Sequence, residues 1–247
     1  MRPILTPGTR SILQSFASAK VLVAFDFDGT LAPIVEKPSR AAMRASTRTL
    51  LRRLATLYPC IVVSGRRRAD VRAKLHGVPL RECIGNHGIE PWSESHAMAR
   101  EVDSWLPALR ERFHDLRGVL VENKRFSVSV HYRGAGNKRK AHQAIKDAAR
   151  ALSNARILAG KQVLNILPRG APGKGLAVER ARRKFHCDKV IYAGDDVTDE
   201  DAFALGENGS FLTIRVGMNR RSLARFYVRN QPEMDQLLRT LIELRAG

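Results

Sequence analysis

Two aspartates end the first strongly apolar run of the chain. Residues 21–25 are apolar and favour β-structure, and Asp26, Asp28 and Gly29 follow at once. A continuous apolar run of this kind predicts a strand that is buried on both faces of a parallel sheet. Because unpaired charge is costly to bury, we expect both carboxylates at the carboxyl end of this strand, where open α/β sheets bind ligands.

The spacing of these two carboxylates favours a metal ion. In an extended chain Asp26 and Asp28 point to one side and Phe27 points to the other. Two carboxylates on one side repel each other unless a cation lies between them, and hard oxygen ligands select Mg²⁺. The alternative is an ordinary D-x-D-G surface turn after a strand.

A second acidic cluster follows a later apolar run. Residues 189–193 are mostly apolar, and Asp195, Asp196 and Asp199 come directly after them. One carboxylate, that of Asp199, would be enough to cap the next helix. Three carboxylates within five residues exceed that need, so we expect this strand end to take part in the same site.

Two further residues could bind an anion. Ser64 follows the apolar run 60–63, and its hydroxyl with the nearby amides could hold a phosphate oxygen at a helix N-terminus. Serine is also a common helix N-cap, which is the alternative. Lys174 begins a predicted helix, where a cation opposes the helix dipole. This position suggests an anionic partner, although a solvated lysine is the alternative.

The elements that must position these residues alternate along the chain, which predicts an α/β fold with a parallel sheet. The expected strands are 21–25, 60–63, 82–85, 119–122, 126–131, 162–167, 189–193 and 210–216. Helical periodicity covers 41–57, 67–76, 98–116, 137–152, 174–185, 199–206 and 232–245.

One segment departs from this alternation. Two strand-like runs lie close together around 117–135, and residues 123–125 between them indicate a hairpin or a bend. A helix at 137–152 and one further strand follow. We therefore expect a small α+β domain at 93–168, inserted into a discontinuous core domain made of residues 1–92 and 169–247, with a hinge-like linker at 168–173.

Composition narrows the possible function classes. The chain has 247 residues, of which 44% are apolar and 27% charged, and its net charge is +19. No apolar run approaches the roughly 18 residues that span a bilayer, and the first residues, which lack an extended apolar stretch, are not expected to be a secretory signal. The basic residues are mostly arginines scattered along helices, without a nucleic-acid recognition module. We expect a cytoplasmic monomer with free thiols at Cys60, Cys83 and Cys187, a small-molecule partner, and no nucleic acid or membrane.

Four segments together resemble the haloacid dehalogenase superfamily of Mg²⁺-dependent phosphohydrolases. They are D-F-D-G-T-L at 26–31, V-S-G-R at 63–66, Lys174, and G-D-D-V-T-D-E at 194–200. The resemblance implies a Rossmannoid core with a C2-type cap domain inserted after the second motif. It also implies that Asp26 forms an aspartyl-phosphate and that Asp28 is the general acid and base.

The same resemblance implies the remaining roles in the core. Mg²⁺ would be bound by Asp26, the backbone carbonyl of Asp28, and Asp195. Asp196 and Asp199 would lie in its outer shell or hold Lys174. Ser64 and Lys174 would stabilise the transferring phosphoryl oxygens.

Within the superfamily, the chain resembles the trehalose-6-phosphate phosphatases. The resemblance rests on D-F-D-G-T-L-A-P-I, V-S-G-R, G-N-H-G-I-E, H-Y-R and G-D-D-V-T-D-E, and it extends over nearly the whole chain. It implies hydrolysis of trehalose 6-phosphate, the last step of trehalose biosynthesis. The substrate-binding residues that it implies are Gly65, Arg66, Asn86, His87, Glu122, Lys124, His131, Arg133 and Asn165.

One position departs from the family pattern. The segment 164–168 reads L-N-I-L-P, and Asn165 stands where the family usually has glutamate. Another sugar phosphate, such as sucrose phosphate or a glycosyl-glycerate phosphate, is therefore the closest alternative. Without the family context, Glu122 and Lys124 would be an exposed salt bridge at a hairpin. A basic binding protein that keeps a degenerate hydrolase fold is a further alternative.

Overall fold

The computed structural model describes residues 1–35, 37–92, 95–160 and 162–246, and the chain forms two compact units. The main unit contains Met1–Gly88 and Gly173–Gly247, and the inserted unit is Ile89–Pro172. The expected start of the insertion, residue 93, lies outside the described residues.

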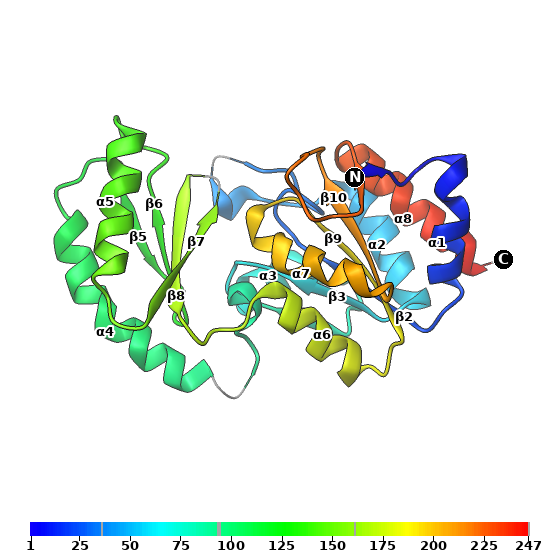
Figure 1. The fold of residues 1–247 in the computed structure, drawn as a ribbon, viewed down its shortest axis with the longest axis horizontal. Coiled ribbons are helices and arrows are strands. Elements are labelled where there is room, and N and C mark those ends of the chain that lie inside the picture. The colour runs from blue at the N-terminus through cyan, green and yellow to red at the C-terminus, as the bar shows by residue number, and fades with distance from the viewer. Residues whose placement is uncertain (36, 93–94, 161, 247) are drawn as a thin grey trace. The chain divides into compact units, whose positions relative to one another are not determined.

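The main unit contains a seven-stranded parallel sheet (Figure 1). Its strand order is β1-β11-β10-β9-β2-β3-β4. The strands are β1 (Arg2–Pro3), β2 (Val21–Phe25), β3 (Cys60–Val63), β4 (Glu82–Ile84), β9 (Lys189–Gly194), β10 (Phe211–Val216) and β11 (Phe226–Val228). The predicted parallel α/β fold is confirmed. Every residue of β2 is buried, as its apolar run predicts.

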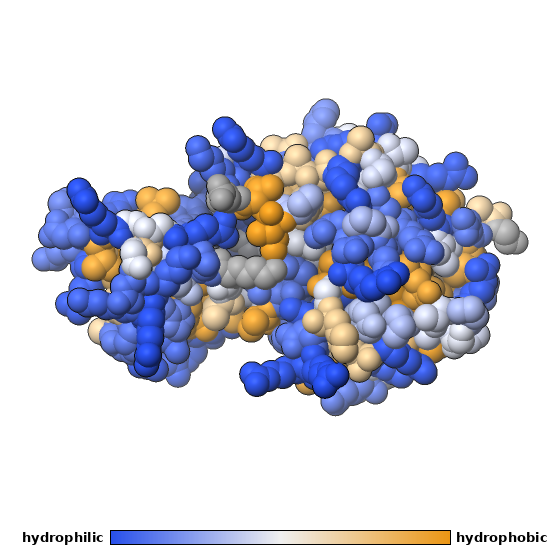
Figure 2. All heavy atoms as spheres, turned by 90° about the horizontal axis from the view of Figure 1, so that it is seen from above, coloured by the Kyte–Doolittle hydropathy of each residue, from blue (hydrophilic) through white to orange (hydrophobic). Residues whose placement is uncertain are grey.

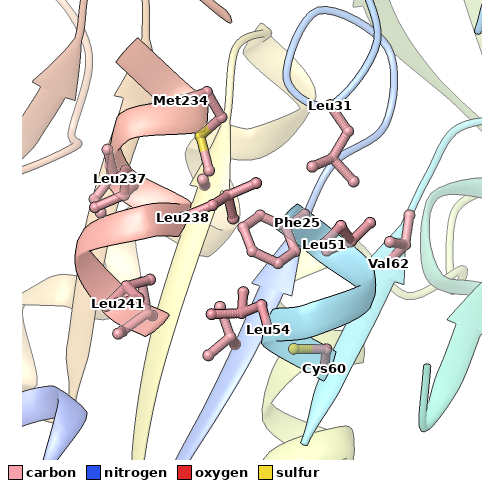
Figure 3. Packing of buried hydrophobic residues seen from close by; sticks show 14 of the residues in the cluster. Phe25, Leu31, Leu51, Leu54, Cys60, Val62, Met234, Leu237, Leu238 and Leu241 are labelled. Carbon is pink, nitrogen blue, oxygen red and sulfur yellow. The ribbon is translucent and has the colours of Figure 1, made fainter. Parts of the chain in front are cut away.

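Helices cover both faces of this sheet (Figure 1). They are α1 (Arg10–Ala17), α2 (Ala45–Leu57), α3 (Arg68–Lys74), α6 (Lys174–Lys184), α7 (Glu200–Phe203) and α8 (Gln231–Ala246). Leu51 and Leu54 of α2 and Leu238 of α8 pack against Phe25 of β2 (Figure 3). Since such side chains recur at helical spacing, each helix turns one apolar stripe to the sheet.

The inserted unit has a four-stranded antiparallel sheet in the order β5-β6-β8-β7. Its elements are α4 (Ser95–Phe113), β5 (Leu120–Asn123), β6 (Val128–His131), α5 (Lys138–Arg150), β7 (Ala155–Gly160) and β8 (Val163–Pro168). Side chains from α4 and α5 pack on one face of this sheet, over residues such as Val130 and Ile166. The predicted hairpin at 123–125 is confirmed by the antiparallel pairing of β5 with β6.

Four elements were not expected from the sequence. The helix α5 is followed by two strands rather than one, since β7 pairs with β8 along its whole length. Ala155–Gly160 has neither a continuous apolar run nor strict alternation, so this strand is recognised only by its hydrogen-bonded pairing with β8. The short strands β1 and β11 form one edge of the main sheet, and the helix α1 precedes β2.

The surface and the cysteines agree with the composition. Hydrophilic residues cover most of the face drawn in Figure 2. Cys60, Cys83 and Cys187 are free, as predicted, and all three are buried. Within the described ranges, no helix is both long and apolar enough to cross a membrane.

Candidate active site

The two acidic clusters meet where the strand order of the main sheet reverses. Asp26 directly follows β2, Asp195 directly follows β9, and these two parallel strands are neighbours. The amide of Asp26 donates to the Ala193 carbonyl at 2.8 Å. Ligand atoms of Asp26, Asp195 and Asp199 all lie within 4.8 Å of one another. The carboxyl ends of adjacent strands thus place the clusters together, at the position where open α/β sheets bind ligands.

Gly29 makes room for this arrangement. Its φ of +89° is a backbone conformation that favours glycine, and a Cβ at this position would overlap the Asp195 carboxylate. The Gly29 carbonyl accepts a hydrogen bond from the Gln231 side chain of α8 at 2.6 Å. The glycine after the paired aspartates is therefore needed for the turn and for the close approach of Asp195.

Lys174 lies between two of the carboxylates. Its ammonium group contacts Asp26 Oδ1 at 2.9 Å and Asp199 Oδ1 at 2.8 Å. The lysine is only 3% exposed. Burial favours the neutral amine, but the two carboxylates outweigh it and raise the pKa of Lys174. The cation at the start of α6, which opposes the helix dipole, is thus stabilised by carboxylates from two strand ends.

Asp199 holds this lysine in place. Its Oδ1 also accepts a hydrogen bond from the Tyr192 hydroxyl at 2.6 Å. Its Oδ2 accepts from the backbone amides of Asp195 and Asp196, both at 2.9 Å. With four donors on its two oxygens, Asp199 is a structural carboxylate rather than a metal ligand. Burial raises the pKa of Tyr192, which keeps its hydroxyl protonated as a donor.

The remaining carboxylates fit a divalent cation. Burial raises the pKa of Asp26 well above its usual value, and Lys174 lowers it only in part. The charges of Asp199 and Asp195 raise it further. A cation bound between Asp26 and Asp195 would relieve this repulsion, and an all-oxygen donor set suits Mg²⁺.

Asp28 has a different environment from Asp26. Its side chain is 38% exposed and pairs with Arg66, whose Nε contacts Asp28 Oδ2 at 2.7 Å. The Asp28 carboxylate is therefore held by a guanidinium, and the metal role that the resemblance implies belongs to its backbone carbonyl. Arg66, expected to bind substrate, donates hydrogen bonds to Asp28, Asp70 and the Pro38 carbonyl, all within the main unit.

The segments after β3 and β4 form one wall. Ser64 is 1% exposed, and its hydroxyl accepts a hydrogen bond from the Arg66 amide at 3.2 Å. Asn86 and His87 have left-handed φ values of 48° and 58°. A Cβ at Gly65 would lie 2.5 Å from the His87 ring. Gly65, Arg66, Asn86 and His87 are expected to contact substrate. The structure thus gathers them, with Ser64, at the ends of the neighbouring strands β3 and β4.

Arg215 contacts the backbone of Asp195, and this role was not predicted from the sequence. It lies in β10, is 8% exposed, and donates a short hydrogen bond to the Asp195 carbonyl. It also contacts Glu200 Oε1 at 3.0 Å. An arginine within the mostly apolar run 211–216 is the signal that could have revealed it, because charged residues are rarely buried without partners.

The inserted unit carries the other expected residues on the polar face of its sheet. Ser129 of β6 pairs in register with both Glu122 of β5 and Asn165 of β8. The Ser129 hydroxyl contacts Asn165 Oδ1 at 2.6 Å, and Asn165 is 4% exposed. Alternation along the strands sends these side chains away from the apolar face. We call this set, with His131 and Lys124, the polar face.

Charged groups border the buried Ser129–Asn165 pair. His131 Nε2 lies 2.8 Å from Glu122 Oε2, and Lys124 Nζ lies 4.0 Å from the same oxygen. The Glu122 side chain is 43% exposed, and Arg133 beyond β6 is exposed. The contact between Glu122 and Lys124 is thus long, and the histidine is the nearer partner.

Known proteins with similar sequences were identified. A family model described as Trehalose-phosphatase matches residues 24–232. A trehalose-phosphate phosphatase of Mycobacterium avium is 38% identical over 196 residues, which cover 73% of this chain and 50% of that protein. A probable trehalose-phosphate phosphatase G of Arabidopsis thaliana is 28% identical over 261 residues, which cover 91% of this chain and 69% of the relative. This chain spans about half the length of its mycobacterial trehalose-phosphate phosphatase relatives.

Solved structures share the fold. The C-terminal domain of a C. albicans trehalose-6-phosphate phosphatase matches with a TM-score of 0.82 and 21% identity over 99% of both chains. A protein described as related to trehalose-6-phosphate phosphatase matches with a TM-score of 0.72 and 26% identity, covering 90% of this chain and 97% of that one. The predicted haloacid-dehalogenase-like fold is confirmed.

Proposed function

Because the chain belongs to the trehalose-phosphatase family, we propose that it is a Mg²⁺-dependent phosphatase that hydrolyses trehalose 6-phosphate. The observation that carries this proposal is the buried contact of Lys174 with Asp26 beside Asp195. A carboxylate nucleophile, a fixed cation and a second carboxylate at one sheet edge suit phosphoryl transfer. The release of trehalose would be the last step of its biosynthesis.

The reaction we propose has two steps. In the first, which begins with Asp28 protonated, an Asp26 oxygen attacks phosphorus, the bond from phosphorus to the sugar oxygen breaks, and Asp28 gives its proton to that oxygen and becomes a carboxylate. In the second, water attacks the aspartyl-phosphate, its proton passes to Asp28, and phosphate leaves. Asp26 returns as a carboxylate, so atoms and charges balance over the cycle.

The charges of the main unit support this chemistry. Lys174 neutralises the Asp26 side chain and would face the charge that develops on the phosphoryl oxygens. Ser64, at the end of β3, would donate to one of those oxygens. Mg²⁺, when bound by Asp26, the Asp28 carbonyl and Asp195, would supply Lewis-acid stabilisation of the phosphoryl group. Asp199 would hold Lys174, and Asp196 would stay in the outer shell.

We assign the inserted unit as the cap domain that recognises the sugar. Its polar face offers a buried neutral pair, Ser129 and Asn165, bordered by Glu122, Lys124 and His131. Such groups bind hydroxyls by hydrogen bonds. Arg133 and the main-unit residues Gly65, Arg66, Asn86 and His87 are the other contacts that the family resemblance implies, although Arg66 is reassigned below.

Asn165 favours one alternative substrate class. The neutral amide at this position, in place of the usual family glutamate, would suit another sugar phosphate, such as sucrose phosphate or a glycosyl-glycerate phosphate. The experiment is Mg²⁺-dependent phosphate release from trehalose 6-phosphate, measured beside a panel of these esters and repeated with EDTA. Faster release from another sugar phosphate would assign that ester as the substrate in place of trehalose 6-phosphate. Absence of turnover on every ester would refute the phosphatase proposal.

We also propose that the protein acts as a cytoplasmic monomer. Three buried free cysteines support a reducing compartment. Light scattering of the purified chain tests the monomer.

A further inference from the structure

The side chain of Arg66 grips both oxygens of the Asp28 carboxylate. Its Nε donates to Oδ2 at 2.7 Å, and its Nη2 donates to Oδ1 at 2.8 Å. Two parallel bonds from a planar guanidinium fix the orientation of a carboxylate as well as its position. Within the described ranges, no other side chain pairs with the Asp28 carboxylate in this way.

Other groups of the main unit hold the Arg66 guanidinium in place. Its Nη1 donates to Asp70 Oδ2 at 2.8 Å, and its Nη2 also donates to the Pro38 carbonyl at 2.8 Å. The guanidinium carbon lies 5.7 Å from the centre of the Phe27 ring. The Arg66 side chain is 11% exposed, whereas that of Asp28 is 38% exposed. A largely buried guanidinium therefore holds a carboxylate that is more exposed to solvent.

We infer that Arg66 is a positioning residue that aims the Asp28 carboxylate at the reacting oxygens, and that Asp70 fixes the arginine in turn. This inference rests on the proposed function, in which Asp28 is the proton carrier. It replaces the expectation that Arg66 binds substrate. Four of the five guanidinium N–H groups are already used by Asp28, Asp70 and Pro38.

The Arg66 guanidinium is also permanently charged. Burial alone disfavours the guanidinium, but hydrogen bonds and charges from Asp28 and Asp70 raise the pKa of Arg66 above its usual range. A lysine would keep the charge and lose the two parallel bonds. Arg66→Lys therefore separates orientation from charge.

Two substrates distinguish a role of Arg66 in positioning Asp28 from a role of Arg66 in binding substrate. A sugar phosphate has a poor leaving group, so it needs the Asp28 proton in the first step and the Asp28 base in the second. In p-nitrophenyl phosphate the leaving group departs without a proton, so only the second step needs Asp28. A variant with a misaimed Asp28 should therefore release one nitrophenol per enzyme in a burst and then turn over slowly.

The experiment compares the purified wild-type chain with Arg66→Ala, Arg66→Lys and Asp70→Asn under saturating Mg²⁺. We expect Arg66→Ala to lower kcat on the sugar phosphate by about 100-fold with KM changed less than about threefold. It should show the nitrophenol burst, and added methylguanidinium should restore part of the rate. Arg66→Lys should stay impaired, and Asp70→Asn should show the same pattern with a smaller loss.

Arg67→Ala is the matched control, because Arg67 is the exposed neighbour and the variant has the same change in charge. It should behave like the wild type, and thermal unfolding of each variant checks the fold. If Arg66 binds the phosphoryl group, KM will rise on both substrates without a burst, which overturns the inference while leaving the proposed function intact. An inactive wild-type chain would overturn both.

Discussion

The two polar sites of this chain handle burial in opposite ways. In the main unit, Lys174 and Asp26 are ionisable side chains that are almost fully buried and in contact at 2.9 Å. In the inserted unit, the buried pair is neutral, with Ser129 and Asn165 at 2.6 Å, and Glu122 beside it is 43% exposed. One site therefore concentrates charge away from water, and the other keeps charge at its border.

This difference matches two chemical tasks. Phosphoryl transfer gains from fixed charges in a water-poor site, where each charge acts strongly on the transition state. The recognition of sugar hydroxyls gains from hydrogen bonds whose loss leaves buried groups unpaired, which discriminates between similar substrates. We therefore expect changes in the main unit to affect kcat and global stability, and changes on the polar face to affect KM.

The largest expected effect is that of Asp26→Asn. The amide is a poor nucleophile, so we expect kcat to fall by at least about 10⁴-fold. Lys174 keeps its contact with Asp199, so the fold should be retained. Phosphate release and circular dichroism on the same sample check both parts. Turnover near the wild-type rate would show that Asp26 is not the nucleophile.

Lys174→Met should give the largest loss of stability. It leaves the Asp26 and Asp199 carboxylates buried without their cation, and breaking a buried ion pair in this way costs about 3–5 kcal/mol of unfolding free energy. Urea unfolding measures it. Lys184→Met is the matched control on the same helix, because Lys184 is 49% exposed and its pair with Glu82 should contribute less than about 1 kcal/mol. Equal losses in the two variants would remove the contrast between buried and exposed charge.

The main-unit site was largely predictable from the sequence. A buried run that ends in aspartates must place them at a strand end, and the structure brings Asp26 and Asp195 together on neighbouring strands. The contacts within loops were not predictable in this way. Arg66 meets Asp28 across 38 positions of sequence, and this pairing depends on how two loops fold rather than on periodicity.

The inserted unit was harder to predict for a related reason. Its polar face depends on the register between strands, and Ser129 reaches Asn165 only because β6 pairs with β8 in one particular register. Ser129 itself lies in an ordinary strand pattern and carries no motif. The buried Arg215 in β10 was similarly visible as a charged residue in an apolar run, but its partner, the Asp195 carbonyl, was not.

A smaller effect is expected for the neutral pair on the polar face. Asn165→Ala leaves the buried Ser129 hydroxyl without this acceptor, which should lower the unfolding free energy by about 1–3 kcal/mol. We expect KM for the sugar phosphate to rise about tenfold, which is the size of one lost hydrogen bond. The rate on p-nitrophenyl phosphate should not change, because that ester has no sugar.

Ser129→Ala and the double variant complete a mutant cycle for this pair. Their combined loss should be smaller than the sum of the single losses, because the two side chains share one interaction. Additive losses would show that Ser129 and Asn165 act independently. A fall in kcat on both substrates would place Asn165 with the catalytic groups and remove the division of tasks between the two units.

The smallest effect should come from Glu179, an ion-paired residue on the same helix as Lys174 but nearer the surface. Hydrogen bonds from Arg182, together with Arg183, outweigh partial burial and lower the pKa of Glu179 from 4.5 to about 2. A carboxylate with a lowered pKa stabilises the fold above its unfolded-state pKa, and this contribution is lost as the pH falls through the folded-state value. Because Arg183 is 75% exposed, water screens its share of the attraction.

Glu179→Gln should therefore lower the unfolding free energy by only about 0.5–1 kcal/mol at pH 7. The difference from the wild type should narrow as the pH falls from 4.5 toward 2, which paired urea titrations at pH 7 and pH 3 can measure. A loss as large as that of Lys174→Met would mean that burial does not separate strong from weak ion pairs on this helix. A loss that does not change with pH would mean that Glu179 stabilises α6 by packing rather than by charge.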